Sequence, residues 1–138
     1  MARPYDFNLV NLIVNYSGGQ EYITGFSNGS EITVARNSDK YTPHVGAKGD
    51  TSYAKTNDNS GTIVFTLKHD SPSNKLLSLL AKSDDTFTTQ LVDGNDIGKA
   101  KAGGGECVIM KPADMPRGAE IGEREWTIAV PNLDMADE

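Results

Sequence analysis

Cysteine and basic residues are scarce in this sequence, and long apolar runs are missing. The single cysteine, Cys107, can form no disulfide within the chain, so synthesis in a cytoplasm is the default expectation. No stretch of about 18 apolar residues predicts a membrane-spanning helix, and the N-terminal residues lack the apolar segment of a signal peptide. The sequence has 13 lysines and arginines and 19 acidic residues, which gives a net charge of -6. Phosphate contacts need clustered cations, so this balance argues against a surface that holds nucleic acid.

Motifs of catalytic or metal chemistry are incomplete. Residues 25–29 match the G-x-S-x-G pattern of serine hydrolases, but a β-branched strand follows where that chemistry needs a helix. His44 and His69 have no second ligand at a metal-binding spacing. A calcium-like loop that begins at Asp93 lacks its third and last ligands.

The acidic pair Glu123 and Glu125 lies on one face of a single predicted strand. Catalytic carboxylate pairs come from different elements that flank a cleft, so a solvated strand face is the favoured interpretation. We therefore expect no enzymatic activity, no cofactor and no metal.

The features that are present favour one β-rich domain, residues 1–138, with a single helix. The 14 glycines, with many threonines and asparagines, suit strands and turns. Residues 61–68 alternate between apolar and polar as a half-buried strand does. Ser71 and Pro72 then form a helix-start signal. The helix, about 71–83, carries a wide apolar stripe that must pack on a sheet, made of Leu76, Leu77, Leu79, Leu80 and Ala81. Of these, Leu76, Leu77 and Leu80 are the expected core residues.

Further strands are predicted at 6–16, 21–26, 31–36, 86–92, 106–111 and 120–130. The first of these is apolar on both faces, so we expect it to be covered on two sides. A hairpin signal lies at residues 27–29. Residues 99–105 predict a flexible glycine-rich segment, and residues 134–138 predict a frayed acidic tail.

Residues 37–60 predict a long loop, because they alternate weakly and contain few large apolar side chains. Such long connections are usually functional or disordered, and Tyr41, Val45 and Tyr53 give this one something to bury against a partner. Charge is uneven as well. Residues 36–55 contain four bases and two acids, whereas residues 113–138 contain seven acids and two bases. Opposite signs in separate regions suit head-to-tail stacking of copies.

The order of these motifs resembles the tail tube proteins of contractile-tailed bacteriophages, within a short family of phage structural proteins. The resemblance covers nearly the whole chain except residues 93–105. It is carried by Asp6-Phe-Asn-Leu-Val, Gly49-Asp-Thr-Ser-Tyr, Gly61-Thr-Ile-Val-Phe-Thr-Leu, Ser71-Pro-Ser-Asn-Lys-Leu-Leu, Lys111-Pro-Ala-Asp and Glu123-Arg-Glu-Trp.

This resemblance implies a two-sheet β-sandwich or barrel with one flanking helix. It also implies hexameric rings whose strands join into an inner barrel and which stack into a tube in the virion tail. A sheath protein would bind outside, a tape-measure protein and DNA would pass through the lumen, and no part would enter a membrane. Type VI secretion tubes and R-type bacteriocins share this architecture.

On this basis we expect inter-subunit or inter-ring contacts from two groups of residues: Tyr41, Lys48, Asp50, Tyr53 and Lys55 in the long loop, and Glu123, Arg124 and Glu125 in the last strand. Three alternatives stay open. The chain could serve a bacteriocin-like or secretion-like tube, it could start or end a tube, or it could be a monomeric β-sandwich that grips a ligand with residues 37–60.

Overall fold

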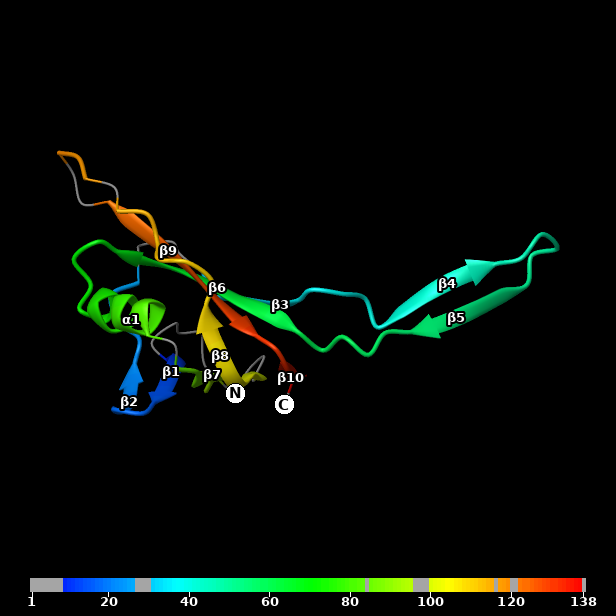
Figure 1. Cartoon of the computed structure of the whole chain (residues 1–138), viewed down its shortest axis with the longest axis horizontal. Coiled ribbons are helices and arrows are strands. Elements are labelled where there is room, and N and C mark those ends of the chain that lie inside the picture. Colours follow the sequence, from blue (N-terminus) through cyan, green and yellow to red (C-terminus); the bar gives the residue numbers. More distant parts are fainter. Residues whose placement is uncertain are drawn as a thin grey trace.

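The computed structural model describes residues 9–26, 31–83, 85–95, 100–115, 117–119 and 122–137. In this part of the chain ten strands and one helix form, in the order β1 (Val10–Tyr16), β2 (Gly19–Tyr22), β3 (Thr33–Arg36), β4 (Tyr41–Val45), β5 (Thr51–Lys55), β6 (Gly61–Lys68), α1 (Ser73–Lys82), β7 (Phe87–Asp93), β8 (Ala100–Ile109), β9 (Glu123–Val130) and β10 (Asp134–Asp137). Figure 1 shows a body made by most of these elements, from which β4 and β5 extend far to one side.

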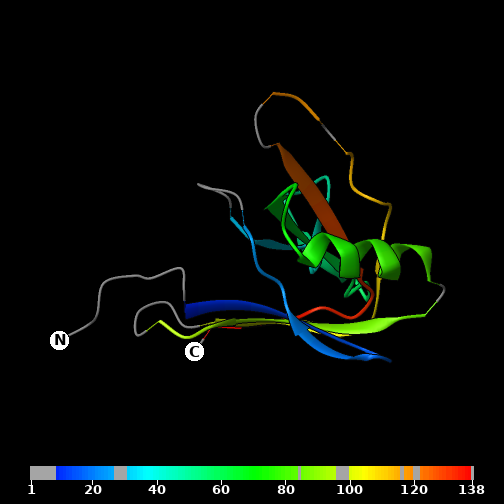
Figure 2. The same cartoon turned by 90° about the vertical axis from the view of Figure 1, so that its left-hand side faces the viewer.

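Two antiparallel sheets make up the body and share strand β8. The first has the order β2-β1-β7-β8, with β10 also paired to β8, and the second has the order β8-β9-β6-β3. Residues 100–104 and Cys107 of β8 pair with β7, whereas Val108 and Ile109 pair with β9. Figure 2 shows the first sheet nearly edge-on as a lower layer, with β9 rising away from it. The fold is therefore the predicted mainly β, two-sheet sandwich, and it does not close into a barrel.

The core lies between the two sheets and is built from alternating strand residues. On β6, Ile63, Phe65 and Leu67 are buried. Strand β9 pairs with β6 along its whole length, and this register sets Trp126 opposite Phe65 and Ile128 opposite Ile63. All five side chains are fully buried. The period-2 pattern predicts this strand correctly because one of its faces is covered and the other is not.

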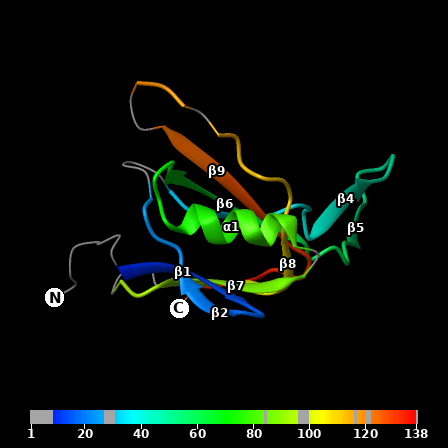
Figure 3. The ribbon, with the colours of Figure 1, turned by 60° about the vertical axis from the view of Figure 1, so that its left-hand side comes forward.

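Helix α1 flanks the sandwich, as predicted, and begins at Ser73. The Ser71 hydroxyl accepts from the Ser73 N–H at 3.3 Å, as the helix-start signal predicts, and it also donates to the Thr24 carbonyl oxygen at 2.6 Å. The second bond ties the helix start to the segment between β2 and β3. Figure 3 shows α1 running between β6 and β9 on one side and β1 and β7 on the other. Three leucines of the predicted stripe are buried in the core, Leu76, Leu77 and Leu80, and Ala81 is half-buried against it. Leu79 of the predicted stripe is exposed, so the buried face is narrower than predicted.

The N-terminal strands are shorter than predicted. Strand β1 begins at Val10, and residues 1–8 lie outside the described part of the chain. Strand β2 ends at Tyr22, and Phe26 forms only an isolated bridge. The hairpin signal at residues 27–29 also lies outside the described ranges.

Strand β1 is covered on both faces, in agreement with its apolar sequence. Leu12 and Val14 are fully buried within the core cluster. Ile13 points to the opposite face of the sheet, because successive strand residues alternate, and it is 8% exposed. The pattern of a strand with two apolar faces is therefore a correct guide to its environment.

The expectation of a flexible segment at residues 99–105 is wrong, because residues 100–105 belong to β8. Gly103 has a φ of 151°, and a Cβ at this position would collide with the Thr89 backbone oxygen of β7. The missing side chain lets the two strands approach closely, so glycine here serves a strand and not a flexible loop.

The acidic C-terminal segment is a strand, whereas its composition predicts a frayed tail. Leu133 is 2% exposed, and its backbone N–H donates to the Asn59 carbonyl oxygen at 2.9 Å. Anchored there, β10 pairs with residues 100–103 of β8. The prediction fails because one apolar residue creates the anchor, and one residue gives no periodic signal.

We expect Leu77→Ala to destabilise the subunit by about 2–5 kcal/mol, the usual cost of truncating a buried leucine. Leu77 is fully buried on α1, whereas Leu79 of the same helix is 58% exposed and supplies the control. Leu79→Ala should change the unfolding free energy by about 0.5 kcal/mol or less. Urea unfolding of both variants measures the difference, and equal, small effects would show that the helix does not pack as described.

Gly103→Ala should cost about 1–3 kcal/mol, because the new methyl group meets the β7 backbone and the backbone angle is unfavourable for alanine. Gly118→Ala is the matched control, since a Cβ there has no atom within 4 Å. Thermal unfolding of the two variants compares them. A Gly103→Ala protein as stable as the control would contradict the close β7–β8 approach.

Candidate functional site

Residues 37–60 form a β-hairpin with its flanking segments, so the predicted long loop is wrong. Strands β4 and β5 pair from Tyr41 opposite Lys55 to Val45 opposite Thr51. We call these two strands and their turn the arm. Every side chain of both strands is exposed. Alternation in a sequence arises when one face of a strand is buried, so a ribbon with two exposed faces lacks that signal and resembles a loop.

The arm presents apolar and aromatic groups to solvent. The Tyr41 and Tyr53 rings meet edge to face with centroids 6.3 Å apart, and the Lys40 ammonium lies 5.5 Å from the Tyr41 ring centroid. Tyr53 is 69% exposed and Val45 71%. The predicted contact residues Tyr41 and Tyr53 are therefore brought together, on a surface that this subunit leaves uncovered.

The tip of the arm is a tight turn that carries two more predicted contact residues. The Gly46 N–H donates to the Asp50 carbonyl oxygen at 2.6 Å, and Gly49 adopts a φ of 89°. Lys48 lies within this turn and is exposed, as is Asp50. The tip therefore places one cation and one anion at the point of the arm farthest from the body (Figure 1).

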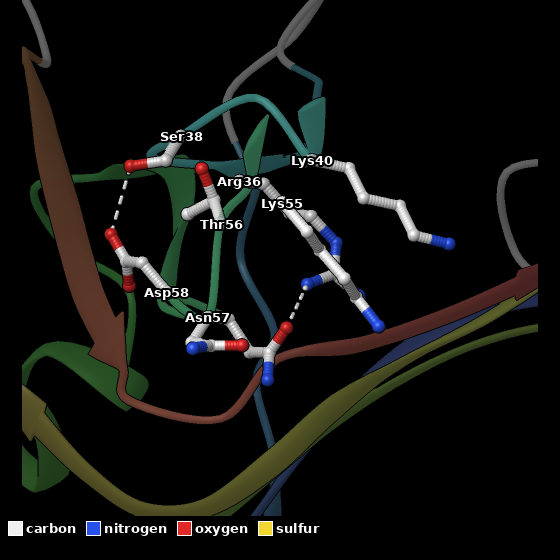
Figure 4. Close-up of a pocket in the computed structure, with 8 residues that line it drawn as sticks. Arg36, Ser38, Lys40, Lys55, Thr56, Asn57 and Asp58 are labelled. Atoms are coloured by element: carbon white, nitrogen blue, oxygen red, sulfur yellow. Dashed lines mark hydrogen bonds between the residues drawn. The ribbon is translucent and has the colours of Figure 1, made fainter. Parts of the chain in front are cut away.

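A polar pocket of about 340 Å³ lies where the arm joins the body, and we call it the root pocket. It is lined by Arg36, Ser38, Lys40, Lys55, Thr56, Asn57, Asp58 and Asn59. Figure 4 shows the Arg36 and Lys55 side chains extending in the same direction, while Lys40 extends to another side. Lys55, predicted as a contact residue, thus belongs to a small cluster of cations.

Asp58 is the one acid among the residues that line the root pocket, and its carboxylate is turned toward Ser38 (Figure 4). Its carboxylate accepts from the Ser60 hydroxyl at 2.6 Å, the Ser60 N–H at 3.0 Å and the Ser38 hydroxyl at 2.8 Å. These bonds lower the pKa of Asp58 below its usual value, and the two bonds from Ser60 have the largest effect. The ionised carboxylate joins the segment before β4 to the segment after β5 at the base of the arm.

The acidic pair of β9 lies in the body, away from the arm. Glu123 and Glu125 are exposed on one face of the strand, in agreement with the predicted solvated face. Arg124, between them, is 4% exposed and points into the interior. The predicted contact residues therefore fall into two groups, one on the arm and one on the body. Arg124 of the second group is buried.

Arg124 forms part of a buried polar network. Its Nε donates to the Asp114 carbonyl oxygen at 3.2 Å and its Nη2 to the Ala113 carbonyl oxygen at 3.0 Å. The guanidinium lies 4.8 Å from the Trp126 ring centroid. Burial, and then the charge of Arg117, lower the pKa of Arg124. Its role is to hold the loop before β9 against the core, so we no longer assign it to an interface.

Sequence reasoning misses several residues of the root pocket. Arg36 is predicted only as the last residue of a strand and as part of a charge count, and Asn57 and Asn59 lie in a polar run that is typical of a loop. The register of β3 with β6 brings Arg36 opposite Gly61, next to the end of the arm. No local sequence pattern encodes that proximity.

The remaining candidate residues form no catalytic or metal site in the described part of the chain. His69 Nδ1 accepts from the Gly122 N–H at 2.9 Å, and His44 is exposed on β4. Cys107 is buried, its thiol donates to the Gly104 carbonyl oxygen at 3.2 Å, and burial raises the thiol pKa. The serine-hydrolase match and the calcium-like loop extend into residues outside the described ranges. Among the described residues, no three His, Cys, Asp or Glu side chains gather as a metal site, and no helix has the length and apolarity to cross a membrane.

Comparisons with known proteins agree with this architecture. The family model described as "Bacteriophage PhiTE tail tube protein" matches residues 1–105. "Structural protein ORF10" of Pseudomonas phage KPP10 is 32% identical over 143 residues, which cover 95% of this chain and 80% of that protein.

Solved structures with a similar fold come from contractile injection systems. A chain in the anti-feeding prophage (AFP) baseplate has a TM-score of 0.65 and 9% identity, covering 99% of this chain and 97% of that one. A chain in the AFP tube terminating cap has a TM-score of 0.60 and 10% identity, covering 100% and 94%. A chain in the sheath/tube terminator of the PVC extracellular contractile injection system has a TM-score of 0.59 and 12% identity, covering 97% of each chain. These identities show a shared fold alone.

The family match spans most of the chain, and the KPP10 relative aligns with nearly all of it. The chain therefore belongs to the Bacteriophage PhiTE tail tube protein family and is a structural component of a phage tail.

Proposed function

We propose that this protein is the repeating subunit of a phage tail tube, in which hexameric rings stack into a conduit for DNA inside a contractile tail. Family membership supports this function, as does a fold shared with chains of tube and sheath assemblies. One observation carries the argument: both faces of the arm are exposed in the single subunit. A two-stranded hairpin alone is marginally stable in water, so the arm is completed by a neighbouring copy.

The contacts follow from where the predicted residues lie. Tyr41, Tyr53 and Lys48 on the arm reach the next ring, and Asp50 accompanies them at the tip. A ring that receives the arm covers the tyrosine pair and so removes apolar surface from water, which favours association.

The partners follow from charge and architecture. A net charge of -6 suits a wall along which DNA slides, because a basic wall would bind phosphate. The tape-measure protein occupies the same lumen during assembly, and the sheath protein binds outside. In this role the protein is a structural subunit and has no catalytic function.

A tube terminator is the second candidate, because two of the similar folds come from a tube terminating cap and a sheath/tube terminator. Electron microscopy of the purified protein at high concentration separates the candidates. A tube subunit gives elongated tubes, a terminator gives rings that do not elongate, and a monomeric binding module gives neither. A bacteriocin-like particle would use the same subunit contacts without a genome.

Removing the outer arm should abolish tubes and leave the fold intact. Replacing residues 43–53 by a short Gly-Ser turn keeps Tyr41 and Lys55, and every side chain removed is exposed. Circular dichroism should therefore show unchanged secondary structure in the body and a melting temperature close to that of the parent chain. Negative-stain images should show rings or monomers only. Long, regular tubes from the shortened chain would contradict the role of the arm in stacking.

A further inference from the structure

We propose that the root pocket binds the carboxylate of Glu125 from a second copy of this chain. The inference rests on the proposed tube assembly and names the contact that gives the assembly its direction. It follows from three features: cations without a carboxylate partner, an acid without a cationic partner, and their positions along one pair of strands.

The cations of the root pocket lack a carboxylate partner among the described residues. Arg36 Nη1 makes one long hydrogen bond, 3.5 Å, to the neutral Asn59 Oδ1. Lys55 Nζ makes no hydrogen bond or ion pair in the described part of the chain. Asp58, the acid of the lining, is occupied by its two serines. The pocket therefore offers a guanidinium and an ammonium that are available to an incoming anion.

The chemistry of the pocket suits a carboxylate. A guanidinium presents a planar fork of donors that matches the two oxygens of a carboxyl group, and a nearby ammonium adds a point charge. The volume of about 340 Å³ accommodates a glutamate side chain together with water. Every residue that lines the pocket has a polar or charged side chain, which favours a charged side chain as the occupant.

Glu125 is the matching acid. It is exposed on β9, and its partner across the strand pair is Thr66, which is neutral. Its neighbours on the same face of β9 are Glu123 and Thr127, and the cation nearest in register, Lys68 of β6, lies opposite Glu123. Within the described residues no lysine or arginine pairs with the Glu125 carboxylate.

Within one subunit the two groups are held apart. The root pocket lies at the Gly61 end of β6, where the Asn37 N–H donates to the Ser60 carbonyl oxygen. Glu125 lies opposite Thr66, five residues farther along β6, a separation of roughly 17 Å at the rise of a strand. Each copy therefore carries the root pocket and the Glu125 carboxylate at different places on its surface. A contact of this type is head-to-tail, which generates rings or open-ended polymers.

Cysteine cross-linking tests the contact without removing any charge. In an Asn57→Cys/Thr66→Cys variant, one thiol lies at the root pocket and the other lies beside Glu125; the native Cys107 is buried. Mild oxidation of assembled protein should give a ladder of covalent multimers on a denaturing gel. Each single-cysteine variant should give no species beyond a dimer.

Adding Glu125→Gln to the two-cysteine chain should slow the ladder about fivefold, the upper range for one exposed ion pair. Glu21→Gln, at an exposed acid of β2, is the matched control and should leave the rate unchanged. Tubes that form without a ladder, or a ladder insensitive to Glu125→Gln, would overturn the pocket contact while leaving the tube function intact. Absence of tubes from the parent chain under all conditions would instead overturn the proposed function, and this inference with it.

Discussion

The body of the subunit depends on a hydrogen bond between two buried side chains, from Trp126 Nε1 to Asn74 Oδ1 at 2.9 Å. The amide nitrogen of Asn74 donates in turn to the carbonyl oxygens of Lys68 and His69, where β6 ends. Arg124 lies over the other partner, the indole ring. A single helix residue thereby joins the end of β6 to β9 within the core, and it satisfies polar groups that would be costly to bury alone.

This self-sufficient body contrasts with the arm. Strands β6 and β9 of the body bury one face with residues of the same chain, whereas both arm strands leave every side chain in solvent. The Ser38, Asp58 and Ser60 hydrogen bonds nevertheless fix the base of the arm. An exposed hairpin whose base is fixed to a stable body is suited to assembly, because its direction is set before a neighbour binds. The structural role of the family and the shape of the subunit therefore agree.

Sequence alone predicts the body well and the candidate site only in part. Alternation locates β6 and β9 because one face of each is buried, and the leucine stripe locates α1 for the same reason. Alternation does not reveal the strands of the arm, because neither face of β4 or β5 is buried. The root pocket is invisible to local patterns, since it depends on the register that brings Arg36 beside Gly61. Arg124 is predicted to lie at an interface because an arginine between two glutamates is typical of a charged surface. In the fold it shares the buried face of β9 with Trp126 and packs over the indole ring.

The central claim is that another copy covers the arm in the assembled tube. Backbone hydrogen exchange over residues 41–55, compared between the free subunit and the tube, tests it most directly. The free arm has two unpaired outer edges, so its exchange should be fast. We predict strong protection of these amides in the tube, while amides of β6 stay protected in both states. Equally fast exchange of residues 41–55 in tubes and free subunits would contradict the claim.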